Sequence, residues 1–536
     1  MISAAVLQTA QAYTPPFTTV KVGLYYGSSA LASANLQNVT GAGSGYQFGT
    51  LDGSRQFVPL GLSTAETKLT VLRDRNMVYD SAGNCYTPGS AGTIVVGCYH
   101  VQLNTSYATY DSAQAAAAAY EKGFVKYSGG SFYVCFGDFI SQDEAAAYIT
   151  VSSIQNAAVT SGSSNTVTVV KTGTDTILFE FENGTTSYLV ISPLSSGGTK
   201  CQTWFKGYKY YGGFQYSRTS GGDLTVINCV NIEDYTKGVI PYEMSNTWPV
   251  EALKAQAVCA RTYVLANIGK HSGFDVCTTE DCQVYRGVSL SNATTDAAVD
   301  QTAGKYLTYN GQLCVAYYSS CDGGATESSE NVWASAVPYL RGVADPYEKN
   351  ITSIASGYYW TVTYTSSSIT QRLRSKGYNC STIVSMAVTQ TTAVGNVYKV
   401  TLTDDTGKTF TFTKGESIRS ALGVSSIHFT ITASGSDDLY VNGSGSVLTG
   451  DQETYYAVGG SGVPALLGQG QLYAVDGSGN TVPVGGESTD KTFVISGAGK
   501  GHNVGMSQWG AYSMAKYYGK TYDQILTFYF TGVTVG

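Results

Sequence analysis

Residues 231–267 read NIEDYTKGVIPYEMSNTWPVEALKAQAVCARTYVLAN, and the part that begins at Trp248 carries the strongest helical pattern in the chain. Pro249 suits a first helical turn, where its nitrogen needs no hydrogen-bond partner, and Glu251 then lies at the positive end of the helix. The alanine, leucine, lysine and glutamine residues that follow have high helix propensity. The stretch therefore predicts one main helix, which begins near residue 249.

Two cations fall on one face of this predicted helix. Lys254 and Arg261 are seven positions apart, which corresponds to about two turns, or roughly 10 Å. The simpler interpretation is a basic stripe in contact with solvent. The alternative is a pair of cations that line a groove and bind acidic groups of a ligand.

Four motifs in and around this stretch carry a family resemblance. They are YTKGV at 235–239, PYEM at 241–244, WPVEALKAQA at 248–257 and ARTY at 260–263. Together they closely resemble the stage II sporulation protein D (SpoIID/LytB) family, over roughly residues 201–536. The resemblance implies a peptidoglycan-active protein of an endospore-forming or related Gram-positive bacterium. It also favours the groove interpretation for the two cations, with muramic-acid carboxylates as the acidic groups.

Glu243 is the acidic residue of the PYEM motif. Apolar Tyr, Met and Trp neighbours would favour its protonated form, as a general acid requires, whereas a nearby helix N-terminus would favour the charged form. From the residues alone, a glutamate that caps a helix N-terminus is the simpler interpretation. In family members that act as lytic transglycosylases, the glutamate at this position is the catalytic acid/base. The resemblance implies that role for Glu243.

A single carboxyl is sufficient for that reaction. Glycosidases usually need two carboxylates, one as acid and one as base or nucleophile. A lytic transglycosylase uses the 6-hydroxyl of the substrate's own muramyl residue as the nucleophile, so proximity is built into the substrate. One residue can protonate the leaving oxygen and then accept the hydroxyl proton, which leaves a 1,6-anhydro end.

His271, Cys277 and Cys282 follow the main helix, in the sequence KHSGFDVCTTEDCQVYRG at 270–287. One imidazole and two thiolates suit zinc, while a disulfide or two free thiols are the alternatives. Some clostridial members of the family bind zinc through a similar set. The fourth ligand stays open, with water or a carboxylate as the options. Many family members have histidine immediately before the last cysteine, where this sequence has Asp281, so the family pattern assigns no role to that side chain. The family pattern also implies that Tyr285 contacts sugar.

Two glycine-containing motifs extend the resemblance. YSSCDGGATE at 318–327 resembles a loop that lines the family's cleft, where glycines let a sugar approach the backbone closely. GKGHNVGMSQWGA at 499–511 resembles the family's last motif, with Asn503 in place of a glycine. An ordinary turn and a structural histidine are the alternatives, and a phosphate loop is disfavoured because no crossover unit surrounds it. The candidate substrate-binding residues here are Ser320, Thr326, His502, Ser507 and Gln508.

A smaller α/β pattern occupies residues 98–155. A strand at 98–104, a helix at 111–122, two strands on either side of Gly129-Gly130 and a helix near Ser141 give the order that begins a ferredoxin-like split βαβ unit. The motifs YHVQ, YVCFGDF and DEA within it resemble a SPOR domain. Such domains bind peptidoglycan glycan strands that lack stem peptides. A generic small α/β module is the alternative.

The composition narrows the classes of function. Charged residues make up 13% of the 536 residues and the net charge is -7, so a nucleic-acid partner is not expected. The 62 glycines and 42 tyrosines are typical of extracellular β-rich proteins, and tyrosine rings suit sugars. The sequence contains no run of 18 or more apolar residues, so no membrane-spanning helix is predicted. The apolar first residues, 1–12, end in AQA, which resembles the end of a signal peptide and predicts export to the cell wall or the medium.

These patterns predict an α+β fold that is β-rich, with one main helix at the catalytic motif and a small ferredoxin-like, SPOR-type module. The predicted segments are a signal-peptide remnant (1–12), a β-rich region (13–97), the SPOR-like module (98–155), a β-rich connection (156–200) and the catalytic domain (201–536). The expected function is a lytic transglycosylase that cuts between N-acetylmuramic acid and N-acetylglucosamine in denuded strands. The alternative is a non-catalytic module that binds glycan and enhances a partner cell-wall amidase.

Overall fold

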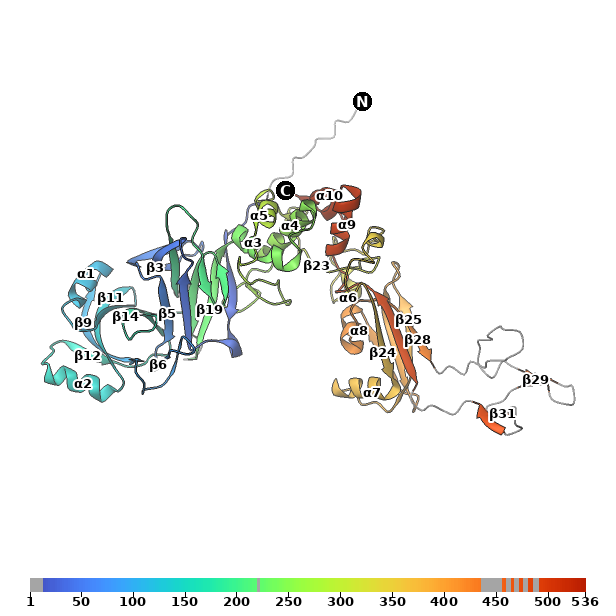
Figure 1. Ribbon diagram of the computed structural model, residues 1–536, viewed down its shortest axis with the longest axis horizontal. Helices are drawn as coiled ribbons and strands as arrows, with labels where there is room; N and C mark the ends of the chain where they lie inside the picture. Colours follow the sequence, from blue (N-terminus) through green and yellow to red (C-terminus); the bar gives the residue numbers. More distant parts are fainter. Residues whose placement is uncertain are drawn as a thin grey trace, which may run out of the picture. The chain divides into compact units, whose positions relative to one another are not determined.

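The computed structural model describes residues 13–218, 222–434, 456–458, 464–466, 472–475, 481–484 and 491–536 (Figure 1). The chain divides into two compact units. Unit 1 runs to Ala316 and also includes Thr534–Gly536, and unit 2 is Tyr317–Val533. The predicted signal-peptide remnant lies outside the described residues. No helix in the described ranges is long and apolar enough to cross a membrane.

Two large sheets form most of unit 1. In spatial order, the seven-stranded sheet contains β20 (Val276–Cys277), β1 (Thr19–Tyr25), β19 (Leu224–Asn231), β18 (Gly213–Arg218), β15 (Leu189–Ser195), β3 (Gly43–Leu51) and β4 (Phe57–Thr64). The ten-stranded sheet contains β12 (Ala157–Thr160), β9 (Tyr99–Tyr107), β11 (Ser131–Phe139), β10 (Gly123–Ser128), β14 (Ile177–Glu182), β13 (Thr166–Lys171), β5 (Lys68–Arg73), β2 (Ser33–Asn38), β16 (Thr203–Phe205) and β17 (Tyr208–Tyr210). A small sheet of β6 (Met77–Asp80), β7 (Cys85–Pro88) and β8 (Val95–Val96) completes this region.

Residues 98–155 contain the predicted order strand–helix–strand–strand–helix. Helix α1 (Tyr110–Ala117) and helix α2 (Gln142–Val151) alternate with β9, β10 and β11, and the neighbours β12-β9-β11-β10 are all antiparallel. Helix α1 ends at Ala117 rather than at 122, because the chain turns there and brings Gly123 against the Ala117 carbonyl.

The sheets cross the predicted domain boundaries. Strand β10 pairs in parallel with β14, so the 98–155 segment continues into a sheet that also holds β5 and β2 from the N-terminal region. In the other sheet, β1 pairs with β19, which leads directly into the helices of the catalytic motif. The boundaries expected at residues 97, 155 and 200 therefore do not separate sheets.

Helices α3 (Ile232–Glu243), α4 (Val250–Ala266) and α5 (Ala293–Asp300) pack together in unit 1 (Figure 1). The predicted main helix is α4, with Pro249 at its N-cap. Helix α3 is an additional helix, which the Asn231 side chain caps by accepting a hydrogen bond from the Glu233 N–H. Beside α4, β22 (Gln312–Leu313) and β35 (Thr534–Val535) lie on either side of β21 (Leu307–Tyr309).

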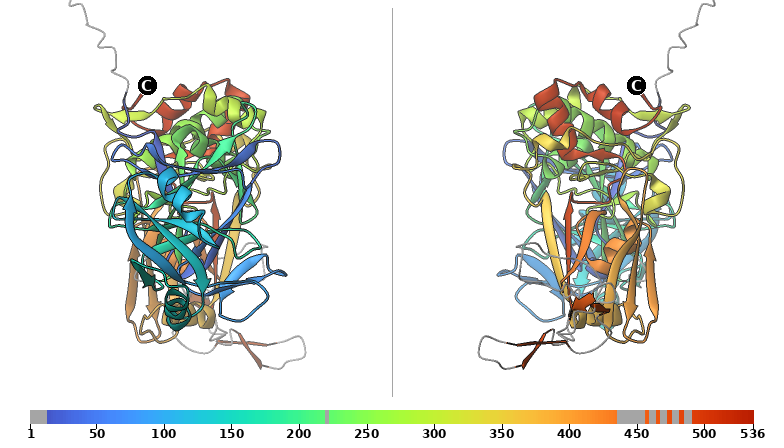
Figure 2. Two further views of the ribbon diagram at one scale, coloured as in Figure 1. Left: turned by 90° about the vertical axis from the view of Figure 1, so that its left-hand side faces the viewer. Right: turned by 90° about the vertical axis from the view of Figure 1, so that its right-hand side faces the viewer.

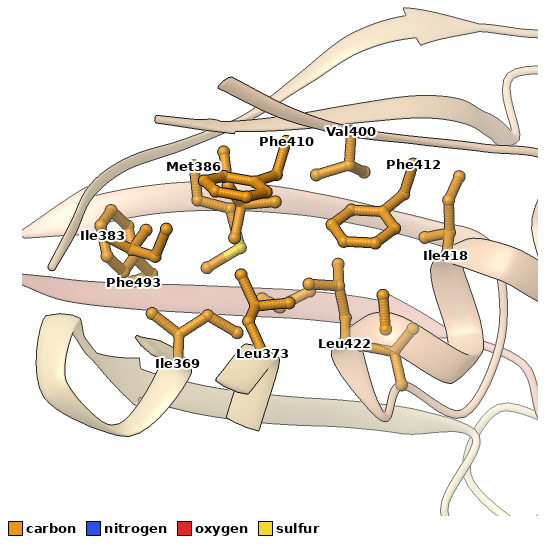
Figure 3. Close-up of a cluster of buried hydrophobic side chains, with 14 of the residues drawn as sticks. Ile369, Leu373, Ile383, Met386, Val400, Phe410, Phe412, Ile418, Leu422 and Phe493 are labelled. Atoms are coloured by element: carbon orange, nitrogen blue, oxygen red, sulfur yellow. The ribbon is translucent and has the colours of Figure 1, made fainter. Parts of the chain in front are cut away.

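Unit 2 has its own core, to which two three-stranded sheets and two helices contribute side chains (Figure 3). Ile369 and Leu373 of α7 (Ser366–Ser375) and Leu422 of α8 (Gly415–Leu422) point toward Phe410 and Phe412 of a neighbouring sheet. The two sheets are β24 (Tyr359–Thr365), β33 (Thr492–Ala498) and β28 (His428–Ser434), and β25 (Ile383–Thr391), β26 (Val397–Asp404) and β27 (Thr409–Thr413).

The two glycine-containing motifs of unit 2 meet in a short parallel sheet. Strand β23 (Tyr318–Ser319) pairs in parallel with β34 (Met506–Ser507), and α9 (Gln508–Tyr518) and α10 (Tyr522–Tyr529), both red in Figures 1 and 2, pack against each other. The remaining elements are α6 (Ser329–Val332), β29 (Tyr456–Val458), β30 (Pro464–Leu466), β31 (Leu472–Val475) and β32 (Thr481–Val484). The described part of the chain is thus β-rich with segregated helices, which confirms the predicted α+β class.

Candidate active site

Glu243 is the last residue of helix α3 and is half-buried. The Val284 N–H donates a hydrogen bond to Glu243 Oε1 over 3.1 Å. The interpretation of Glu243 as an N-terminal cap is wrong, because α4 begins only at Val250. The carboxyl group is instead held at a helix C-terminus by a backbone amide of the segment that follows Cys282.

That segment is tied to α3 and to the sheet by two further hydrogen bonds. Tyr235 donates its hydroxyl to Gln283 Oε1 over 2.9 Å, and Tyr285 donates its hydroxyl to Asn228 Oδ1 over 2.6 Å. Tyr285 is 1% exposed, so its expected contact with sugar does not fit the structure. Its ring instead packs on Gly238, where an added Cβ would lie 2.5 Å from the ring.

Arg261 is fully buried and does not line a groove. Its guanidinium binds the Glu233 carboxylate and also donates to the Lys305 and Val299 carbonyls over 3.2 and 3.3 Å. The predicted pairing of Arg261 with Lys254 as two groove cations is therefore wrong. The reason is tertiary: α3 and α5 pack over the face of α4 that carries Arg261. Lys254 is half-buried and pairs with Glu251 over 2.7 Å.

His271, Cys277 and Cys282 come together as the spacing predicted, and Asp281 joins them. The ligand atoms of the four side chains all lie within 4.8 Å of one another. His271 Nε2 lies 3.3 Å from Cys282 Sγ, and Asp281 Oδ2 lies 3.8 Å from each of the other three donor atoms. Ligands at the bond lengths usual for tetrahedral zinc lie about 3.3–3.8 Å apart, so this donor set fits that ion.

The four donors are held in place by their neighbours. The Phe274 ring stacks on the imidazole with ring centroids 4.8 Å apart, and β20 places Cys277 beside β1. A hydrogen bond from Cys282 lowers the pKa of the Cys277 thiol to about 5. All eleven cysteines lie in the described ranges and are free, so the alternative of a Cys277–Cys282 disulfide is wrong.

Ser507 and Thr326 are both 1% exposed in unit 2 and serve as internal hydrogen-bond partners. Ser507 donates to Glu348 Oε1 over 2.5 Å and caps α9 by accepting from the Gly510 N–H. Thr326 accepts from the Val343 N–H over 2.9 Å. Their expected contact with substrate does not fit this burial.

Ser320, Gln508 and His502 occupy the same motif region of unit 2. Ser320 is half-buried and its carbonyl accepts a hydrogen bond from the Trp509 N–H, while Gln508 is the buried first residue of α9. The Val504 N–H donates to His502 Nδ1 over 3.1 Å, and the imidazole lies beside the Trp333 ring. Burial lowers the pKa of His502 to about 4, so its imidazole is neutral at physiological pH. The structural interpretation of this histidine matches its surroundings.

The comparisons with known proteins agree with the motifs. The family model described as "SpoIID: Stage II sporulation protein" matches residues 220–309. Stage II sporulation protein D of Bacillus subtilis is 30% identical over 324 residues, which cover 57% of this chain and 74% of the relative. The chain belongs to the stage II sporulation protein D family. An uncharacterised protein of Brachyspira hyodysenteriae is 31% identical over 334 residues, 61% of this chain and 73% of the relative.

One further relative has a name that refers to a different function. The amidase enhancer of Bacillus subtilis is 33% identical over 307 residues, which cover 56% of this chain and 40% of the relative. The range matched by the SpoIID family model contains Glu243 and all four donors of the His/Cys/Asp cluster. The residues of the glycine-containing motifs lie outside that range, in unit 2.

Three residues with a clear structural role have weak signals in the sequence. Asp281 stands out only because it precedes Cys282, at a position where many family members have histidine. Asn503 adopts a φ of 63°, a left-handed conformation that asparagine tolerates better than most residues, which explains how it can replace the family's glycine. Glu348 accepts from the Asp322 and Gly323 N–H groups over 2.8 Å each, and no sequence motif singled it out.

Proposed function

We propose that this SpoIID-family chain is a lytic transglycosylase of cell-wall remodelling, with Glu243 as its single acid/base. The observation that carries the proposal is the hydrogen bond from Val284 N–H to Glu243 Oε1, which orients the carboxyl group of the PYEM motif. An acid that must first donate a proton to the glycosidic oxygen and then accept one from the 6-hydroxyl group needs such a fixed orientation.

The proposed reaction cuts the bond between N-acetylmuramic acid and N-acetylglucosamine in peptide-denuded strands. Glu243 donates its proton to the leaving glycosidic oxygen while the C1–O bond breaks. The resulting carboxylate accepts the proton of the muramyl 6-hydroxyl as O6 bonds to C1. The products are a 1,6-anhydro end and a new 4-hydroxyl end, and Glu243 is protonated again. No water is consumed.

Zinc held by His271, Cys277, Cys282 and Asp281 is part of the proposal. The donor set is one that zinc prefers. Because His271 and Cys282 are the first and last residues of the loop 271–282, a bound zinc ion would hold the two ends of the loop together. Gln283 and Val284 follow directly and contact α3, so a fixed loop keeps the amide that orients Glu243 in place. The role assigned to zinc is structural, and the proton transfers are carried out by Glu243.

The decisive experiment compares Glu243→Gln with the unchanged chain on denuded glycan strands. Glutamine keeps the shape and the hydrogen bond from Val284 but cannot donate a proton to the leaving oxygen, so release of anhydro-ended fragments should fall by about 10²–10⁴-fold. Glu251→Gln is the matched control on the neighbouring helix and should retain activity. Mass spectrometry of the fragments measures the release, and thermal melting checks the fold. Wild-type release by Glu243→Gln would refute the assignment.

The second candidate is a non-catalytic enhancer of a cell-wall amidase. It is supported by the 33% identity to the Bacillus subtilis amidase enhancer. If the unchanged chain releases no anhydro ends but increases the rate at which an added amidase removes stem peptides, this function replaces the first. Both functions place the chain at peptidoglycan, so export to the cell wall is proposed for either.

The SPOR-like segment at 98–155 is proposed to bind glycan that lacks stem peptides. Its support is the antiparallel strand order β12-β9-β11-β10 with two interleaved helices. Because β10 also pairs with β14, the segment should be tested within the full chain. Equal binding of the chain to denuded and to intact peptidoglycan would count against this role.

A further inference from the structure

The β24-β33-β28 sheet of unit 2 has two very different faces. On one face, residues such as Val362, Phe493 and Ile495 pack into the hydrophobic core of Figure 3. On the other face, Tyr359, Thr361, Thr363, Thr430, Thr432 and Ser496 are exposed, in strict alternation with the core residues. This face therefore carries mainly hydroxyl groups, with Val494 and Ala498 as apolar residues among them and no charged side chain at the positions named here.

The hydroxyl groups of the exposed face are aligned across the three strands. Thr361 pairs with Ser496, and Ser496 pairs with Thr430, so the three side chains form one row across the sheet. Tyr359, Ala498 and His428 form the next row. The phenol ring of Tyr359 therefore stands beside a row of hydroxyl groups, and Tyr359 is 68% exposed.

A hollow of about 520 Å³ opens over these two rows. Tyr359, Thr361, His428, Thr430, Ser496 and Ala498 are among the residues that line it. None of the lining residues is Asp, Glu, Lys or Arg. His428 hydrogen-bonds Asn396 Oδ1 over 3.0 Å, and burial lowers the pKa of its imidazole, so the lining is uncharged at neutral pH.

This lining selects among ligand classes. A nucleic acid or an acidic peptide needs cations, and a basic peptide needs carboxylates; the hollow offers neither. An uncharged sugar presents hydroxyl groups that both donate and accept, as Thr and Ser do, and a C–H face that packs on an aromatic ring. The volume lies in the range of small-ligand sites.

We propose that this face of unit 2 binds uncharged N-acetylglucosamine units of a glycan strand, with Tyr359 as the stacking residue. The choice of a glycan as ligand rests on the proposed function. The site is a second contact with the strand, and of its lining residues only Gly323 belongs to one of the motifs quoted above. It would anchor the polymer while Glu243 acts on another part of a strand.

The test uses the full chain with Glu243→Gln, so that binding is measured without cleavage. The probe is a chitooligosaccharide of β-1,4-linked N-acetylglucosamine, and hydrogen exchange reports which amides it protects. We expect protection in β24 and β28, together with about 5–10-fold weaker binding in calorimetry after a further Tyr359→Ala change. The matched control is Tyr517→Ala, at a tyrosine of unit 2 that is 51% exposed on α9, and it should leave binding unchanged.

A second variant keeps the proposal open to refutation. Thr430→Arg fills the hollow from an exposed position where folding should be unaffected, and it should abolish protection of β24 and β28. The absence of protection in the parent chain, or unchanged binding in both Tyr359→Ala and Thr430→Arg, would overturn the proposal. Release of anhydro ends by the chain that retains Glu243 is measured separately, so failure of this site and failure of the proposed reaction are distinguishable.

Discussion

Arg261 of α4 and Glu233 of α3 form a buried two-pronged ion pair. Arg261 Nη2 lies 2.6 Å from Glu233 Oε2, and Arg261 Nε lies 3.0 Å from each carboxylate oxygen. The Arg261 side chain is fully buried while that of Glu233 is 26% exposed. The pair fixes the start of α3 on α4, and Glu243 lies at the other end of the same helix.

Replacing Arg261 should therefore damage folding rather than substrate binding alone. Arg261→Ala empties a fully buried site and leaves Glu233 without its partner, which should cost about 3 kcal/mol of the free energy of unfolding, the low end of the range for buried pairs because Glu233 keeps contact with solvent. Arg261→Lys should recover only part of this, because an ammonium group cannot form the planar fork. Urea unfolding measures both variants. An Arg261→Ala chain with unchanged stability and weaker glycan binding would restore the groove interpretation.

Metal analysis of the purified chain should find about one zinc ion. Cys277→Ser combined with Cys282→Ser should remove it and lower the melting temperature, because the metal binds only the folded loop. Asp281→Ala removes the exposed donor and should weaken zinc binding, whereas Glu280→Ala, one residue earlier and outside the four-donor cluster, is the control. Unchanged zinc content in the double serine variant would exclude this site.

The stability of unit 2 should fall as the pH rises from about 4 to about 6. Burial and the nearby Glu348 carboxylate raise the pKa of Asp345 to about 6, and burial also raises the pKa of Asp322. For an acid whose pKa is higher in the folded state, the stabilisation is complete below the unfolded value of about 3.9 and is lost above the folded one. For Asp345 alone this amounts to about 3 kcal/mol.

Urea unfolding from about pH 4 to about pH 8 tests this sign. Asp345→Asn cannot titrate, so the difference in stability between the variant and the unchanged chain should shift in favour of the variant as the pH rises. Tyr529 donates its hydroxyl to Asp345 Oδ2 and can do the same to the amide oxygen of asparagine. A difference that is constant across this pH range would contradict the prediction.

Gly238→Ala should destabilise the chain although alanine is the better helix former. The added Cβ would meet the Tyr285 ring at 2.5 Å, and such overpacking typically costs about 1–3 kcal/mol, more than the roughly 1 kcal/mol gained in helix propensity. Because Tyr285 follows Val284, activity should fall as well. Gly53→Ala is the control, since an added Cβ there meets nothing within 4 Å. Equal melting temperatures for the two variants would show that the ring can move aside.

The sequence predicted features that depend on neighbouring residues better than features that depend on packing. Helix α4 follows from propensity, and the cluster of His271, Cys277 and Cys282 follows from spacing within one loop. Helix α3 was not predicted, because Gly238 and Pro241 weaken its pattern and packing compensates for them. The burial of Arg261 could not be predicted either, since it depends on Glu233 and on two other helices. The same holds for the sheets that cross the expected boundaries.

The pairing of β35 with β21 determines when unit 1 can be completed. Thr308 lies opposite Thr534 and Leu307 opposite Val535, so two parts of one small sheet are separated in the chain by all of unit 2. A ribosome must therefore synthesise residues 317–533 before β21 can gain this neighbour. Until then β22 is the strand that β21 has beside it in this sheet. Unit 1 is therefore completed only after the whole of unit 2 has been synthesised.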